Sequence, residues 1–224
     1  IAASWETYVA SKFGSPSRTT VMNPRVFDDT FCEDSGSYCW GNNNDALYLN
    51  AMVPEVDETG YPVAMEAYDL ASATSRLVLT GIDHVKSGWS MVWNWDIYNG
   101  EAINFPGNPP FGSALETFLY SDAAESDYSS DKGEFCAANP EQCACAGPEA
   151  VDALYWAQLR ETCEPGDEHC IELCGAYAPG SREHTICTST APVREVMHRV
   201  YLSPETATGP DWFNTRYNRI HYYE

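Results

Sequence analysis

Residues 87–100 read Ser-Gly-Trp-Ser-Met-Val-Trp-Asn-Trp-Asp-Ile-Tyr-Asn-Gly, and this stretch indicates the fold class. Large apolar side chains recur there at every second position: Trp89, Met91, Trp93, Trp95 and Ile97. This period of two predicts a half-buried β-strand, and the Asn-Gly pair at its end predicts a tight turn. Aromatic side chains bury roughly 150–250 Å² each, so we expect a core to be built against the three tryptophans.

The chain before this strand carries the same kind of pattern. Strand-like segments lie at residues 46–53, 61–70 and 76–82, each bounded by residues that favour turns. Several short strands separated by such turns are typical of an antiparallel β-sandwich or jelly roll. Residues 1–105 are therefore predicted to form an antiparallel β domain.

The chain after this strand has a different composition. Residues 104–113 contain three prolines and two glycines, which predicts a loop and a boundary. Apolar residues at helical spacing predict a helix over residues 149–163 and a second over residues 190–202. The aromatic tail, residues 212–223, is expected to pack back on the body. We expect an α+β protein whose residues 106–224 form a helical, cystine-rich region on the β domain, or one continuous domain with it.

Nine cysteines lie in two regions of the chain, with none between residues 40 and 135. This clustering predicts a disulfide framework made in an oxidising, extracellular compartment. The count is odd, so at least one thiol has no partner within the chain. The cysteines are Cys32, Cys39, Cys136, Cys143, Cys145, Cys163, Cys170, Cys174 and Cys187.

The chain carries a formal net charge of −21 at pH 7. Such a surface repels phosphate backbones, which argues against nucleic acid as a partner. No apolar run is long enough for a transmembrane helix, so membrane insertion is not expected. Ile1 and its neighbours do not resemble a signal peptide, and a secretory leader already removed would explain that.

The polar positions of the tryptophan-rich strand are the first candidate site. Asn94, Asp96 and Tyr98 alternate with the tryptophans. Amides, carboxylates and aromatic rings on a sheet face are suited to binding sugars, and Glu66 on a neighbouring strand could supply the second carboxylate of a glycoside hydrolase. The alternative is an ordinary solvent-facing surface.

The second candidate is a calcium site in the acidic segment around residue 130. Asp127, Ser129, Asp131 and Glu134 provide oxygen ligands at short intervals. The spacing departs from that of an EF-hand loop, because Lys132 stands where glycine is needed and Gly133 comes one place late. An irregular calcium site and a flexible acidic loop both remain open.

No familiar catalytic motif is present in the sequence. The G-x-S-x-G elbow, the H-E-x-x-H helix and the P-loop are absent. We therefore expect a secreted, disulfide-stabilised structural or surface protein that associates with itself or with another extracellular protein. The alternative is a carbohydrate-binding or glycan-active β-sandwich that uses residues 89–98.

Overall fold

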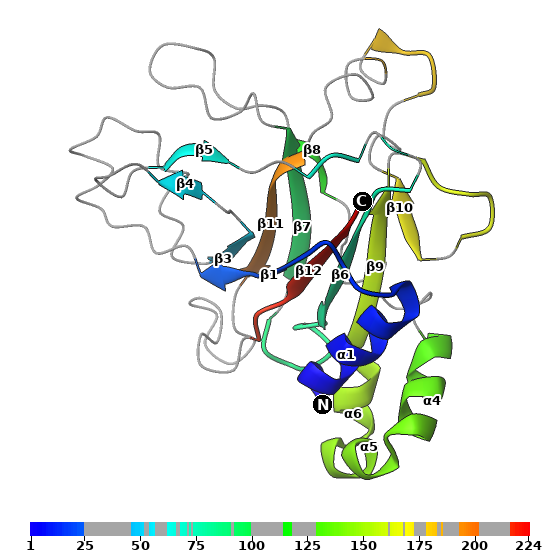
Figure 1. Cartoon of the computed structure of the whole chain (residues 1–224). Coiled ribbons are helices and arrows are strands. Elements are labelled where there is room, and N and C mark those ends of the chain that lie inside the picture. Colours follow the sequence, from blue (N-terminus) through cyan, green and yellow to red (C-terminus); the bar gives the residue numbers. More distant parts are fainter. Residues whose placement is uncertain are drawn as a thin grey trace.

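The computed structural model describes sixteen stretches of the 224-residue chain, and they form a mixed α+β structure (Figure 1). The described residues are 1–24, 46–51, 54–56, 62–65, 68–70, 72, 74–90, 92–99, 114–117, 129–160, 162–167, 169–172, 178–182, 185, 193–201 and 216–224.

The first five-stranded sheet, sheet A, has the strand order β1-β12-β6-β9-β10. Its strands are antiparallel except for β10, which runs parallel to β9. The central strand β6 pairs Leu79 with Ile220 of β12 on one side and with Ala157 of β9 on the other. The bounds are β1 Arg18–Val21, β6 Arg76–Ile82, β9 Leu154–Arg160, β10 Cys170–Glu172 and β12 Arg219–Tyr223.

The second five-stranded sheet, sheet B, has the order β2-β3-β11-β7-β8 and is antiparallel throughout. Its central strand β11 pairs His198 with Leu49 of β3 and with Trp95 of β7. A separate hairpin joins β4 and β5. The bounds are β2 Asn23–Pro24, β3 Ala46–Ala51, β4 Pro54–Val56, β5 Pro62–Met65, β7 Val92–Asn99, β8 Ala114–Thr117 and β11 Val193–Tyr201.

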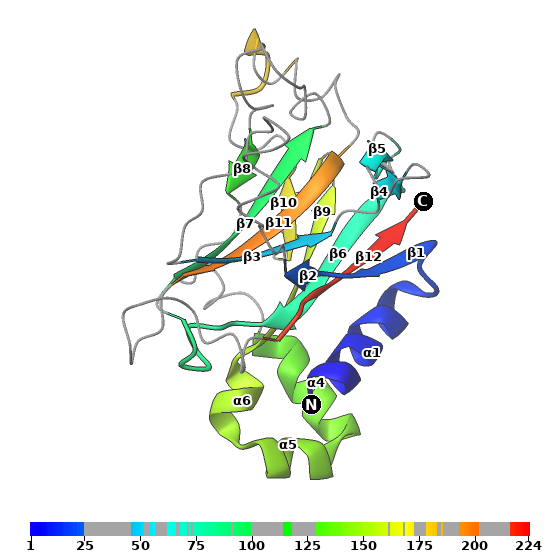
Figure 2. The ribbon, with the colours of Figure 1, turned by 90° about the vertical axis from the view of Figure 1, so that its left-hand side faces the viewer.

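Four helices lie together at one end of the molecule, beside sheet A (Figures 1 and 2). They are α1 Ala2–Phe13, α4 Ser129–Ala138, α5 Pro140–Ala146 and α6 Pro148–Asp152. Proline begins α5 and α6, where its missing N–H is not needed. Gly147 separates these two helices with a φ of 79°, a conformation that favours glycine.

Two buried clusters hold these elements together, and each covers one face of sheet A. The larger cluster contains Leu77, Leu79 and Ala157 of sheet A together with Trp93 and Val200 of sheet B. The smaller cluster lies on the other face, where Val78 and Trp156 meet Trp5 and Val9 of α1 and Phe135 of α4. Sheet A is therefore apolar on both faces, and Arg76–Ile82 is buried along almost its whole length.

The predicted strands of the first half are confirmed in part. Trp89, which the alternation placed on the strand with Trp93 and Trp95, lies instead in the turn before β7 and packs against the smaller cluster. Residues 46–51, 62–65, 76–82 and 92–99 are strands, and Trp93 and Trp95 are fully buried. The predicted mixture of helices and antiparallel strands is also confirmed. The finer prediction of a sandwich or jelly roll stays a prediction at this point.

The two helix predictions in the second half are wrong in most of their length. Residues 193–201 form the central strand of sheet B, not a helix. Of the predicted helix 149–163, only the beginning is helical, in α6, and Leu154–Arg160 is a strand. In β9 both faces are buried, so the period of two is hidden by apolar residues at successive positions. In β11, the buried face is Val196, His198 and Val200, and the histidine interrupts the apolar alternation.

The prediction for the aromatic tail is confirmed for its described part. Residues 219–223 form β12, which lies between β1 and β6, and Tyr222 and Tyr223 are both 6% exposed. Both sheets thus contain strands from before and after residue 105.

Candidate functional site

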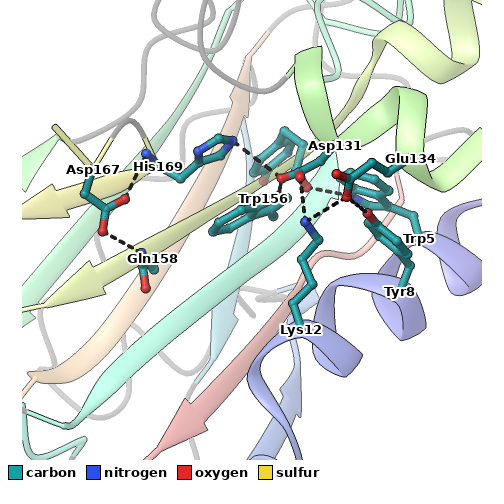
Figure 3. Close-up of polar contacts among 10 residues, drawn as sticks. Trp5, Tyr8, Lys12, Asp131, Glu134, Trp156, Gln158, Asp167 and His169 are labelled. Atoms are coloured by element: carbon teal, nitrogen blue, oxygen red, sulfur yellow. Dashed lines mark hydrogen bonds and ion pairs between the residues drawn. The ribbon is translucent and has the colours of Figure 1, made fainter.

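Asp131, one of the predicted calcium ligands, lies in the first turn of α4 and is only 7% exposed. Lys12 of α1 donates to its Oδ1 at 2.5 Å, and the indole N–H of Trp156 on β9 donates to its Oδ2. His169 Nε2 lies 3.6 Å from the same Oδ2. Figure 3 shows these side chains converging on the carboxylate from three elements. We call Asp131, Lys12, Trp156 and His169 the Asp131 cluster.

The outer side of this cluster is formed by the facing surfaces of α1 and α4. Tyr8 donates its hydroxyl hydrogen to Glu134 Oε2 at 2.7 Å, and Lys12 Nζ lies 3.5 Å from the same carboxylate oxygen. Burial opposes the charge of Lys12, but the hydrogen bond and the charge of Asp131 outweigh it, so the pKa of Lys12 is raised. The ammonium group is thus held charged between two carboxylates.

The inner side of the cluster is held by a short cystine loop. The disulfide Cys163–Cys170 closes this loop, and the ring of His169 stacks on Trp156 with centroids 4.3 Å apart. Asp167 fixes the loop by accepting hydrogen bonds from Gln158 and Arg160 on β9. The cluster therefore cross-links α1, α4 and the β9–β10 connection.

This arrangement occupies the oxygens that the calcium prediction requires. Asp131 and Glu134 are both engaged by α1, Ser129 begins a helix instead of a loop, and Asp127 lies outside the described residues. Among the residues described, no group of three or more His, Cys, Asp or Glu side chains is placed to hold a metal ion. The calcium site stays a prediction without structural support.

A second polar cluster joins residues of both sheets and is buried. His84 follows β6, His198 lies on β11 and Asn218 precedes β12, and all three are 0% exposed. The rings of His84 and His198 have centroids 5.4 Å apart, and Asn218 Nδ2 lies 2.8 Å from His198 Nδ1. Asn218 also donates to the hydroxyl of Tyr155 at 2.9 Å. We call His84, His198, Asn218 and Tyr155 the core histidine cluster.

Several polar atoms of this buried region have no hydrogen-bond partner in the part of the chain that is described: His84 Nδ1, His198 Nε2, Asn218 Oδ1 and Oδ2 of the adjacent Asp83. Burial lowers the pKa of His84 to about 4. Burial, together with the charge of His84, lowers the pKa of His198 well below its ordinary value. Both imidazoles are therefore neutral at pH 7.

The tryptophan-rich strand β7 is joined to this region by its indole groups. Trp93 donates its N–H to Asp83 Oδ1 at 2.7 Å, and Trp95 donates to the Tyr155 hydroxyl at 3.1 Å. The ring of Trp95 stacks on His198 with centroids 4.7 Å apart. Both indoles are thus fixed inside the core and neither lines an open groove.

The three predicted sugar-binding positions occupy β7 between and beyond these tryptophans. Their backbones pair as strand residues, Asn94 with Arg199, Asp96 with Met197 and Tyr98 with Glu195. Their side chains lie outside the described set, as does Glu66. Their role in binding stays a prediction.

The cysteine framework is confirmed for the cysteines that the structure describes. Disulfides join Cys136 to Cys143 and Cys163 to Cys170, and Cys145 is an exposed free thiol. The remaining four, Cys32, Cys39, Cys174 and Cys187, lie outside the described residues.

An open hollow of about 570 Å³ lies between the start of α1 and helices α5 and α6, away from both polar clusters. Its lining is Ile1, Glu141, Gln142, Cys145, Ala146 and Ala150, which form no recognisable catalytic set. Within the described ranges, every helix is too short or too polar to cross a membrane.

No protein-family model, curated protein or solved structure matches this chain.

The core histidine cluster was not among the predicted sites. The available signal was His198, which stands between Val196 and Val200 on what proved to be the buried side of a strand. The helical interpretation of this segment concealed that signal. Lys12 could not have been paired with Asp131 from sequence, because the two residues lie 119 positions apart.

Proposed function

We propose that this chain is an extracellular structural or surface protein, built on a β-sandwich and stabilised by disulfides, that assembles with further copies of itself or with another extracellular protein. The observation that carries the proposal is the complete burial of Trp93 and Trp95, each with its indole N–H bonded inside the core. The most conspicuous aromatic strand of the sequence thus serves as scaffold.

The sandwich is supported by the composition of the larger buried cluster. Apolar side chains of β6, β9 and β12 share this cluster with side chains of β3, β7 and β11. Two sheets whose inner faces bury each other's side chains are the defining arrangement of a sandwich.

An extracellular location is supported by the two disulfides. Both close short loops at the helical end of the molecule, Cys136–Cys143 between α4 and α5 and Cys163–Cys170 before β10. Structural disulfides of this kind persist in oxidising compartments and are rare in reducing ones. The proposed assembly role rests on the scaffold character of β7 and on the two polar clusters, whose described contacts cross-link elements of the fold.

The test is the molar mass of the purified chain, measured by light scattering over a wide range of protein concentration, with electron microscopy of the same samples. A fixed oligomer or a polymer supports the proposal. A strict monomer at the highest concentration, with no partner captured from extracellular fluid, overturns the assembly role.

The same sample distinguishes the glycan-binding alternative. A glycan array is probed with the wild-type chain and with the variants Asp96→Ala and Tyr98→Ala. Glycan binding that both variants lose, with unchanged unfolding curves, would replace the structural proposal by a binding function. The matched control is Thr19→Ala, on an exposed position of β1 in the other sheet, which should leave any glycan binding unchanged.

A further inference from the structure

His84 makes one hydrogen bond that depends on its protonation state. Its Nε2 accepts the backbone N–H of Arg216 at 3.2 Å, and this bond joins the turn after β6 to the segment that leads into β12. A ring nitrogen accepts a hydrogen bond only through its lone pair. The neutral ring must therefore carry its hydrogen on Nδ1, and Nε2 is the atom that a further proton would reach.

We propose that His84 is an acid-released latch: protonation at Nε2 breaks the hydrogen bond from Arg216 and frees Arg216 from the turn after β6. The proton adds to the lone pair of Nε2, and no covalent bond breaks. Two N–H groups then face each other where one donor and one acceptor stood before. The latch is independent of the proposed structural function, since it follows from this contact alone.

The surroundings of His84 offer its charged form little compensation. His198 on β11 faces it ring to ring, at a centroid distance of 5.4 Å, and its own neutral ring is buried too. Arg216 brings a positive charge, with its guanidinium 5.7 Å from the ring of Trp89. The nearest carboxylate in sequence is Asp83, whose Oδ1 accepts the backbone N–H groups of Val85 and Lys86 and the indole N–H of Trp93, and whose Oδ2 has no hydrogen-bond partner among the described residues. No hydrogen bond joins either imidazole to a carboxylate in the part of the molecule described.

The segment that the latch holds is linked to other parts of the core. Asn218, two residues after Arg216, contacts His198 and Tyr155, and its carbonyl accepts the N–H of Met22 after β1. The ring of Trp89 lies beside both residues of the latch, with its centroid 6.3 Å from that of His84 and 5.7 Å from the guanidinium carbon of Arg216. Release should therefore begin at Arg216 and leave the strand pairing of β12 in place. The low pKa of His84, about 4, sets the acidic range in which to look for it.

Hydrogen exchange of the full chain, followed by nuclear magnetic resonance from pH 7 to pH 4, tests the proposal. The protection factor of the Arg216 amide, corrected for the intrinsic rate at each pH, should fall about tenfold or more across this range. The Met22 amide, which is bonded to the backbone carbonyl of Asn218, is the internal control, and its protection should fall less than that of the Arg216 amide. In His84→Gln, the side-chain carbonyl can accept the same hydrogen bond but does not titrate, so the protection of Arg216 should become independent of pH.

Three results would overturn the latch. Arg216 could lose protection equally in the wild type and in His84→Gln, it could lose protection only together with Met22, or it could keep its protection down to pH 4. If His84→Gln does not fold, the ¹⁵N chemical shift of His84 Nε2 in the wild type decides. Protonation of Nε2 at the pH where Arg216 loses protection supports the latch, and loss of protection without protonation refutes it.

Discussion

Gly81 on β6 is the position where one added methyl group should disturb the core most directly. A Cβ built there would lie 2.1 Å from Asn218 Oδ1, 2.4 Å from Asn218 Cγ and 2.9 Å from the Tyr155 hydroxyl oxygen. Each distance is far below van der Waals contact, and all three atoms are buried. Gly81→Ala must therefore displace Asn218, which also contacts His198.

The expected cost of Gly81→Ala has two parts. Forcing a methyl group into a packed core costs about 2 kcal/mol, and loss of one buried hydrogen bond of Asn218 costs about 1 kcal/mol more. We expect the free energy of unfolding to fall by about 3 kcal/mol, measured by urea denaturation followed by tryptophan fluorescence.

Gly133→Ala is the matched control for this substitution. Gly133 is an exposed residue inside α4, and a Cβ there meets no atom within 4 Å. The same change should stabilise the protein by about 1 kcal/mol, because alanine favours the helix. An unfolding curve of Gly81→Ala that coincides with the wild type, or a gain in stability equal to that expected of the control, would refute the packing argument.

Three other predictions concern the ionisable groups and one disulfide. Burial lowers the pKa values of His84 and His221 to about 4, so the unfolded chain binds more protons below pH 6.5. The free energy of unfolding should be constant above pH 6.5 and fall below it. His84 alone should lower it by about 2 kcal/mol between pH 7 and pH 5. Urea unfolding curves that are the same at pH 7 and pH 5 would contradict this prediction. Asp131→Asn should cost about 1–3 kcal/mol, since it leaves Lys12 without its buried partner. Thermal melts of Asp131→Asn, Lys12→Met and the double variant should show coupling, and strictly additive losses would argue against the ion pair. Replacement of Cys163 and Cys170 by alanine should lower the free energy of unfolding by about 2–3 kcal/mol. It should also alter the near-ultraviolet circular dichroism of Trp156, because the disulfide holds the loop that carries His169. An unaltered spectrum would show that the His169–Trp156 stack does not depend on the disulfide.

Sequence patterns predicted the strands whose two faces differ or whose apolar run is short. The strand Arg76–Ile82 has its predicted bounds, and Trp93 and Trp95 lie on the buried face that their alternation indicated. The pattern failed at β9 and β11, where the tertiary environment sets the structure. Leu154 and Tyr155 are adjacent in sequence and enter different clusters on opposite faces of sheet A, so both positions are apolar and the sequence shows no alternation.

The polar clusters could be predicted even less well, because their members come from distant parts of the chain. Asp131 was proposed for its oxygen atoms, but its neighbours Lys12, Trp156 and His169 are assembled only by the packing of α1 and α4 against β9. Likewise, His84 and His198 are 114 positions apart, and their rings meet with centroids 5.4 Å apart although one follows β6 of sheet A and the other lies on β11 of sheet B. The sequence showed which side chains carry polar or ionisable groups, but it did not show which of these side chains would be in contact.

The place of β12 between β1 and β6 has a consequence for how this protein is made. Arg18–Val21 has β12 as its one neighbour in the strand order of sheet A, and Arg219–Tyr223 is translated after every other strand of both sheets. During synthesis about 200 residues are added between β1 and its partner β12, and until β12 is made the edge of β6 that pairs with it stays unpaired. Sheet A can therefore be completed only after residue 223 has left the ribosome. A chaperone that binds the nascent chain until then should raise the yield of folded protein.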